Sequence, residues 1–166
     1  MEDEQRERAR MRYAGRCGYC GVHEDNAGAA QTLDHHRPRV YGDGDDDENI
    51  VYCCPKCNAH KGVYWHETDS PNIRLLHPFH DDIPAHLKEN EGGQLVGLTP
   101  QGVFFIQRLH LNRPQLVAYR LHRGVAQKQH DELDTLRQQV RELQQRVVEL
   151  NEAIELVSNE IERERT

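Results

Sequence analysis

The chain has 166 residues, of which 36% are hydrophobic, and its formal net charge is −7. This length predicts one domain with an appended tail, and the low apolar content predicts a small core that needs a further cross-link. The acidic charge excludes a uniformly basic nucleic-acid binder, because phosphate contacts come from Lys and Arg, but it does not exclude a local basic patch.

Residues 1–12 alternate acids and arginines, which is typical of a solvated helix start or a disordered arm, and both alternatives stay open. The segment lacks the apolar region of a signal peptide, and no later stretch is apolar enough to span a membrane. Five cysteines in such a chain favour metal-bound thiolates over disulfides. We therefore expect a cytoplasmic protein.

The cysteines form two C-x2-C pairs, Cys17 with Cys20 and Cys54 with Cys57. Two such pairs supply four thiolates for one tetrahedral zinc ion of a structural kind. A disulfide between Cys17 and Cys20 is the alternative. Cys53 lies outside the C-x2-C spacing, so we interpret it as a small buried residue.

Between the cysteine pairs, a short β-like run at residues 31–33 leads into Asp34 and His35, and Pro38 then forces an extended turn. Residues 49–52 are apolar enough for a second strand. A helix is expected to start near Pro55.

The connecting loop at residues 41–48 superficially resembles the start of a calcium loop, through Asp43, Asp45 and Asp47. The sixth position would be Glu48 instead of Gly, and the twelfth would be Cys54 instead of Glu. A solvated connector is therefore expected.

These residues together resemble the HNH endonuclease family, in the variant whose last motif residue is Asn. The family motif has an apolar residue before Asp-His-x-x-Pro, an Asn that opens the next strand, and C-x2-C-[His/Asn]-x2-Lys at a helix start. The matching residues here are Leu33, Asp34, His35, Pro38, Asn49, Cys54, Cys57, Asn58 and Lys61.

The resemblance implies a ββα-metal fold and specific roles for its residues. His35 would be the general base, since imidazole titrates near neutral pH. Asn49 would brace the loop that orients this base. Asp34 and Asn58 are hard oxygen ligands that suit Mg²⁺ or Mn²⁺. Candidate contacts to backbone phosphates are Arg37, Arg39 and Lys61.

Beyond residue 62 the signals are weaker. His77 and His80 flank Pro78, and we interpret them as packing or surface groups. Residues 94–98 and 103–106 are expected to form a hairpin around a turn at residues 99–102. Asn112 is expected to cap a helix that begins near Pro114 and runs toward Gly124. The HPFHDD run, the hairpin and LHLNR also resemble the extension of HNH proteins in bacterial anti-phage systems of the Septu and retron kind.

From residue 133 the apolar positions alternate in steps of three and four, which predicts a coiled coil through residues 133–161. The seam consists of Leu133, Leu136, Val140, Leu143, Val147, Leu150, Ile154, Val157 and Ile161. Mostly β-branched a positions and mostly leucine d positions favour a parallel homodimer. The alternatives are packing on the chain's own body, or docking on a partner protein such as the ATPase of a defence system.

The sequence therefore predicts an α+β protein with three parts: an arm at residues 1–12, an HNH domain with its extension at 13–124, and a coiled-coil helix at 125–166. The expected function is metal-dependent hydrolysis of phosphodiester bonds, most simply in DNA and in bacterial or phage defence. The alternative is a non-catalytic zinc-knuckle adaptor that binds nucleic acid or protein and assembles through its coiled coil.

Overall fold

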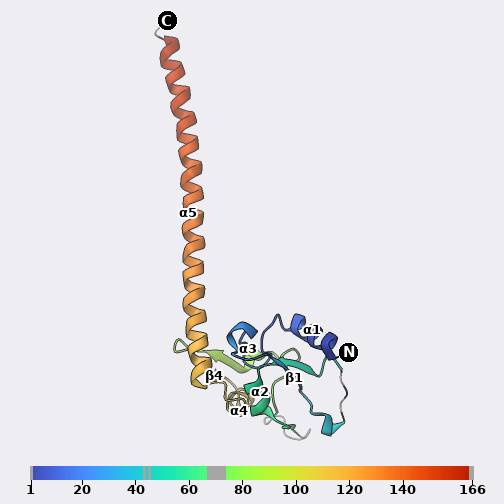
Figure 1. The fold of residues 1–166 in the computed structure, drawn as a ribbon. Coiled ribbons are helices and arrows are strands. Elements are labelled where there is room, and N and C mark those ends of the chain that lie inside the picture. Colours follow the sequence, from blue (N-terminus) through green and yellow to red (C-terminus); the bar gives the residue numbers. More distant parts are fainter. Residues whose placement is uncertain (1, 43, 45, 67–73, 165–166) are drawn as a thin grey trace. The chain divides into compact units, whose positions relative to one another are not determined.

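The computed structural model describes residues 2–42, 44, 46–66 and 74–164. It confirms the α+β class. The helices are α1 (Glu2–Arg12), α2 (Pro55–Lys61), α3 (Ile83–His86), α4 (Pro100–Arg108) and α5 (Pro114–Glu164), with short 3-10 helices at Glu24–Asn26 and Arg39–Tyr41. The strands are β1 (Thr32–His35), β2 (Ile50–Cys53), β3 (Leu87–Glu89) and β4 (Leu95–Gly97), and Figure 1 labels most of these elements along the chain. The contacts form two compact units, Met1–Leu121 and His122–Thr166.

A β-hairpin followed at once by a helix forms the centre of the first unit. Strands β1 and β2 are antiparallel, with Asp34 opposite Val51 and His35 opposite Ile50. All four residues of β2 are buried, so this strand lies in the hydrophobic core. Cys54 then caps α2, because its sulfur accepts a hydrogen bond from the Cys57 amide. This is the ββα unit that the sequence predicted.

Helix α1 is an ordered part of the first unit, which decides between the two alternatives for residues 2–12. It lies against β2, and Ala9 on its inner face is only 7% exposed. On its outer face Arg10 pairs with Glu24 at 2.6 Å, and Arg8 pairs with Asp47 at 2.9 Å. Some of the charged side chains of α1 therefore form ion pairs, and others face solvent.

The predicted hairpin at residues 94–106 is wrong in its second half. Strand β4 pairs with β3, which precedes it, whereas residues 103–106 belong to helix α4. Thr99 is the N-cap of that helix and accepts a hydrogen bond from the Gly102 amide, with Pro100 at the first position. The short apolar run of residues 103–106 fits a helix or a strand equally well. The N-cap at Thr99 therefore selects the helix.

Asn112 does not cap helix α5. Its side chain instead donates to the carbonyl of Leu95 at 2.8 Å and accepts from the amide of the same residue at 2.7 Å. Asn112 therefore holds β4, and α5 starts at Pro114 as expected. The helix continues through Gly124 without a break.

The calcium-loop comparison included Asp43 and Asp45, which lie outside the described residues.

Gly102 is expected to tolerate no side chain. A Cβ there would lie 1.9 Å from the His86 carbonyl oxygen, which is held in place by the Leu98 amide at 2.7 Å. Gly102→Ala should therefore destabilise the first unit by about 1–3 kcal/mol, measured by denaturant unfolding. The matched control is Gly124→Ala, where a Cβ meets nothing within 4 Å and should stabilise the helix by about 0.5–1 kcal/mol. Equal stability of the two variants would contradict this packing.

Candidate active site and metal centre

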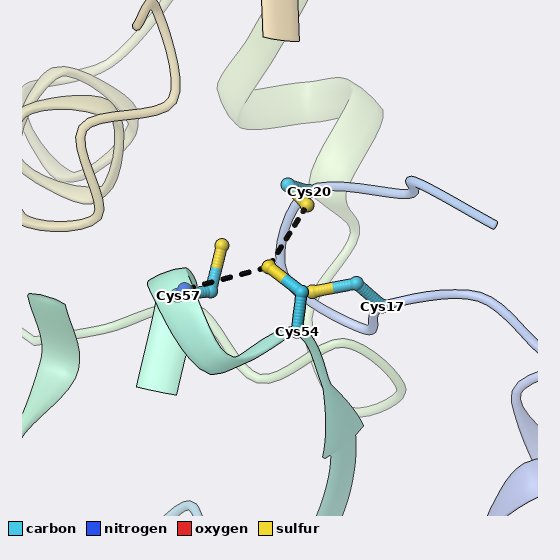
Figure 2. Close-up of side chains that lie close together, drawn as sticks. All are labelled: Cys17, Cys20, Cys54 and Cys57. Atoms are coloured by element: carbon cyan, nitrogen blue, oxygen red, sulfur yellow. Dashed lines mark hydrogen bonds between the residues drawn. The ribbon is translucent and has the colours of Figure 1, made fainter. Parts of the chain in front are cut away.

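Four cysteines meet at one point in the first unit. The sulfur atoms of Cys17, Cys20, Cys54 and Cys57 all lie within 4.8 Å of one another, and Figure 2 shows them converging from the first knuckle and from the start of α2. The knuckle is tied to the hairpin because the Gly18 amide donates to the Tyr52 carbonyl at 2.8 Å. All five cysteines are free thiols, so the alternative of a disulfide is not found.

This cluster has the composition and spacing of a tetrahedral zinc site. Four sulfurs that each lie about 2.3 Å from one ion are about 3.8 Å apart, close to the 3.9 Å between Cys20 and Cys54. Hydrogen bonds among the four thiols lower the pKa of Cys54 and raise the pKa of Cys57. Arg113 adds positive charge, donating toward the sulfurs of Cys54 and Cys57 at 3.6 and 3.5 Å. The fifth cysteine, Cys53, is fully buried outside the cluster, as expected.

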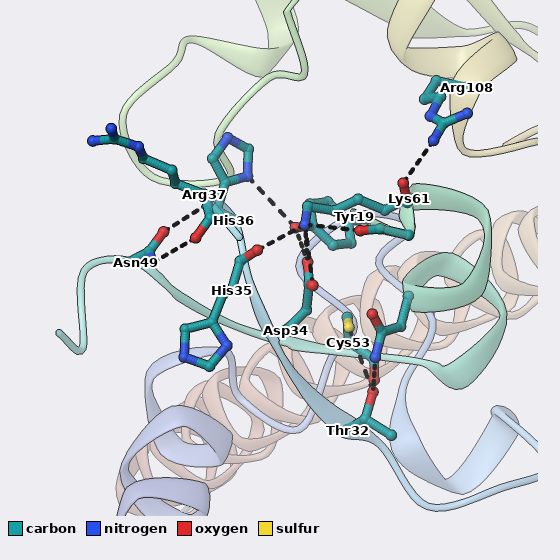
Figure 3. Close-up of polar contacts among 12 residues, drawn as sticks. Tyr19, Thr32, Asp34, His35, His36, Arg37, Asn49, Cys53, Lys61 and Arg108 are labelled. Carbon is teal, nitrogen blue, oxygen red and sulfur yellow. Dashed lines mark hydrogen bonds and ion pairs between the residues drawn. The ribbon is translucent and has the colours of Figure 1, made fainter. Parts of the chain in front are cut away.

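Asp34 lies in a buried polar network (Figure 3). The Tyr19 hydroxyl donates to its Oδ2 at 2.6 Å, and the Lys61 ammonium donates to its Oδ1 at 3.1 Å. Burial raises the pKa of Asp34, although Lys61 and Tyr19 act in the opposite direction. Lys61 is itself 0% exposed and also donates to the His35 carbonyl at 2.7 Å. The residue that the sequence proposed as a phosphate contact is thus the counter-ion of Asp34 in this structure.

The His35 and Asn58 side chains each have a partner other than Asp34. The His35 ring points away from it (Figure 3), and its Nε2 accepts a hydrogen bond from Arg39 Nε at 3.2 Å. The Asn58 amide donates to the Thr32 hydroxyl at 3.2 Å. Among the described residues, the cysteine cluster is the one group of three or more His, Cys, Asp or Glu close enough to hold an ion.

Asn49 clamps the chain two residues beyond His35. Its Oδ1 accepts from the Arg37 amide at 2.7 Å and its Nδ2 donates to the Arg37 carbonyl at 3.0 Å. The Asn49 carbonyl also accepts from the His36 amide at 2.8 Å, which prolongs the pairing of β1 with β2. A bracing role for Asn49 requires contacts of this kind.

Arg12 and His77, from segments distant in the sequence, hold the loop just before Asn49. Arg12 donates to the Asp47 carbonyl at 2.7 Å, and the His77 ring lies 3.0 Å from the Glu48 carbonyl through Nε2. His77 Nδ1 accepts from the amides of Phe79 and His80, so its Nε2 is the protonated nitrogen. The interpretation of His77 as a packing group is confirmed. Its role depends on contacts across 29 residues of chain, which no local pattern reveals.

Under the bracing role that the HNH resemblance implies for Asn49, Asn49→Asp is expected to lower the rate of phosphodiester cleavage about 10²-fold, the cost of a misplaced catalytic group. The substitution keeps the acceptor for the Arg37 amide but removes the donor to the Arg37 carbonyl. Single-turnover cleavage measures the effect. Asn151→Asp, on the exposed part of α5, is the matched control. A wild-type rate in Asn49→Asp would contradict the bracing role.

Comparison with protein families gives one finding. Residues 17–63 match the family model of the HNH endonucleases. No curated protein and no solved structure matches the chain. The matched segment contains both cysteine pairs and the whole β1–β2–α2 unit. The segment that holds the candidate site therefore matches the HNH endonuclease family.

Proposed function

We propose that the chain is a metal-dependent endonuclease that hydrolyses phosphodiester bonds in DNA. The observation that carries this proposal is the family match over residues 17–63, on a ββα unit that bears Asp34, His35 and Asn58. HNH endonucleases act on nucleic acid, and the finer statements about DNA, the catalytic ion and the residue roles are our proposals.

In the proposed reaction His35 takes a proton from the attacking water. Its Nε2 is an acceptor in this structure, toward Arg39, so water would replace that donor when substrate binds. Arg39 would then be released toward a backbone phosphate, and Arg37 is a second candidate for such a contact. Asn49 keeps the Arg37 backbone, and with it the end of β1, in a fixed position.

Asp34 and Asn58 would hold Mg²⁺ or Mn²⁺ through a carboxylate and an amide oxygen, a donor set that suits these ions. When bound, such an ion supplies positive charge that stabilises the transition state and the leaving 3′-oxygen. Asp34 already pairs with the Lys61 ammonium at 3.1 Å, so ion binding requires Lys61 to give up part of this contact.

The ion pair between Asp34 and Lys61 also favours the alternative function, that of a non-catalytic adaptor. With Lys61 as its permanent counter-ion, Asp34 would be a structural group, and the chain would be a zinc-knuckle adaptor without activity. The test is cleavage of supercoiled plasmid by the zinc-loaded chain with added Mg²⁺ or Mn²⁺, against the same reaction without either ion. Ion-dependent nicked or linear product supports the nuclease. Uncut plasmid with both ions would establish the adaptor.

We further propose a place in bacterial or phage defence, on the resemblance of residues 77–82 and 109–113 to the extensions of defence-type HNH proteins. None of the described helices is long and apolar enough to cross a membrane. Free thiols at all five cysteines fit a reducing compartment, and we propose the cytoplasm.

The seam of residues 133–161 is proposed to form a parallel homodimer. All nine seam residues are exposed, with Leu143 at 64% and Ile154 at 62%, over roughly 42 Å of helix. An uncovered apolar stripe of this length is unfavourable in water, and a second copy supplies a matching stripe. Two active sites on one stalk would favour paired nicks. A defence-system ATPase is the competing partner.

Leu143→Lys is expected to convert the dimer into a monomer, because it places a charge at a central d position. Sedimentation equilibrium of the full chain at micromolar concentration measures the state. Gln145→Lys introduces the same charge outside the seam, four residues before Glu149, and should leave the dimer intact. A wild-type chain that is monomeric would rule out the homodimer and leave the ATPase as the proposed partner.

A further inference from the structure

A cavity of about 270 Å³ opens beside the segment that Asn49 braces. Aromatic rings form much of its wall, and residues Gly44, Asp46 and Glu48 of the loop before Asn49 complete it. The rings and their neighbours are His36, Arg37, Asn49, Trp65, His77 and His80. The volume lies just below the roughly 300–1,000 Å³ of pockets for whole drug-sized ligands. The cavity therefore has room for one ring system.

The rings around this cavity are packed against one another. His36 meets Trp65 edge to face at 5.8 Å and His77 at 4.6 Å between ring centroids. His77 stacks on His80 at 4.0 Å, and the Arg37 guanidinium lies 5.6 Å from the Trp65 ring centre. His36 and His77 are buried, so the more exposed Trp65 and His80 offer the surface on which another flat ring can stack.

The charges of the cavity favour a neutral ligand over an anionic one. Burial lowers the pKa of His77 to about 4, so this imidazole is neutral at pH 7. Asp46 and Glu48 add negative charge at the rim, against the single guanidinium of Arg37. A phosphate group is therefore disfavoured here.

We propose that this cavity takes one unpaired nucleobase of the nucleic-acid substrate, next to the phosphate that is cleaved. The inference rests on the proposed nuclease function and adds to it a class of substrate, DNA with an unstacked base at the cleavage site. Arg37 and Asn49 belong both to the cavity wall and to the brace beside His35. A nucleobase bound in the cavity would thus fix the position of the nucleic-acid strand relative to His35.

Trp65 is the single tryptophan of the chain, so its fluorescence reports directly on the cavity. The zinc-loaded full chain, without added Mg²⁺ or Mn²⁺, is titrated with a single-stranded DNA 12-mer in which one abasic site is moved along the strand. Fluorescence anisotropy of labelled DNA gives the affinity, and tryptophan quenching gives the occupation of the cavity. One abasic position should weaken binding about 5- to 150-fold, the range for losing one base stacked on an aromatic ring.

Substitutions in the cavity wall test whether the critical base binds in this cavity. Trp65→Ala should weaken binding to a similar degree, and the critical abasic site should then cause little further loss, because both changes remove the same contact. Trp65→Phe keeps a ring and should recover part of the affinity. His80→Ala tests a wall residue whose side chain is 54% exposed, where folding is not at risk, and His122→Ala on the exposed part of α5 is its matched control.

The outcomes separate this inference from the proposed function. Equal affinity for every abasic position, or unchanged binding in both Trp65→Ala and His80→Ala, overturns the base pocket, while plasmid cleavage with Mg²⁺ or Mn²⁺ would still support the nuclease. Failure to bind the 12-mer together with failure to cleave overturns both. One critical position that couples to Trp65 supports the pocket.

Discussion

His35→Ala is expected to lower the rate of DNA cleavage about 10²- to 10⁴-fold, the contribution of a positioned general base. The His35 ring is half-buried at the end of β1, and its Nε2 is the nitrogen that accepts a hydrogen bond. Alanine removes this acceptor but leaves the backbone carbonyl that receives the Lys61 ammonium. The fold and the zinc content should therefore stay at wild-type values.

Single-turnover cleavage of plasmid at saturating Mg²⁺ or Mn²⁺ measures this effect. His122→Ala, at an exposed position of α5, controls for the loss of a histidine far along the chain. Circular dichroism and zinc analysis of His35→Ala exclude a change in folding. A wild-type rate in the folded variant would show that another group takes the proton, and the assigned mechanism would be wrong.

Cys57→Ser is expected to abolish zinc binding and, with it, the folded state of the first unit. Binding of a structural zinc contributes on the order of 10 kcal/mol or more, whereas whole domains are stable by about 5–15 kcal/mol. The buried core here is small and includes three of the four clustered cysteines, Cys17, Cys54 and Cys57. Elemental analysis should give one zinc per wild-type chain and none in the variant, whose circular dichroism should retain mainly the signal of α5.

Cys53→Ser is the matched control, since Cys53 is the last residue of β2, four residues before Cys57, and lies outside the cluster. It should keep one zinc per chain, at a cost of about 1–3 kcal/mol for a buried hydroxyl. The Thr32 hydroxyl, 3.7 Å from the Cys53 sulfur, is near enough to act as a partner. A Cys57→Ser chain that unfolds cooperatively at the wild-type temperature would show that zinc does not hold the fold together.

The local parts of the site follow from the sequence, because short spacings determine them. The sequence has only two C-x2-C pairs, so the grouping of Cys17 and Cys20 with Cys54 and Cys57 is predictable without coordinates. The same holds for the ββα unit, whose strands and helix are each shorter than eight residues. The apolar seam of α5 also follows from its period alone.

Other features depend on contacts between distant segments, and only the tertiary structure decides them. Residues 103–106 are equally apolar in a strand or a helix, and the Thr99 cap together with the close approach to His86 selects the helix. Asn112 does not cap α5, because its side chain makes two hydrogen bonds to the β4 backbone at Leu95.

The electrostatics of the site are the least predictable part. Lys61 lies 27 residues from Asp34 in sequence, and burial of both groups makes the lysine a counter-ion instead of a surface contact. Likewise the His77 ring meets the loop before Asn49 only when residues 46–49 and 77–80 fold together. A sequence pattern names the groups that are able to react, whereas burial and long-range contacts decide which partner each group has.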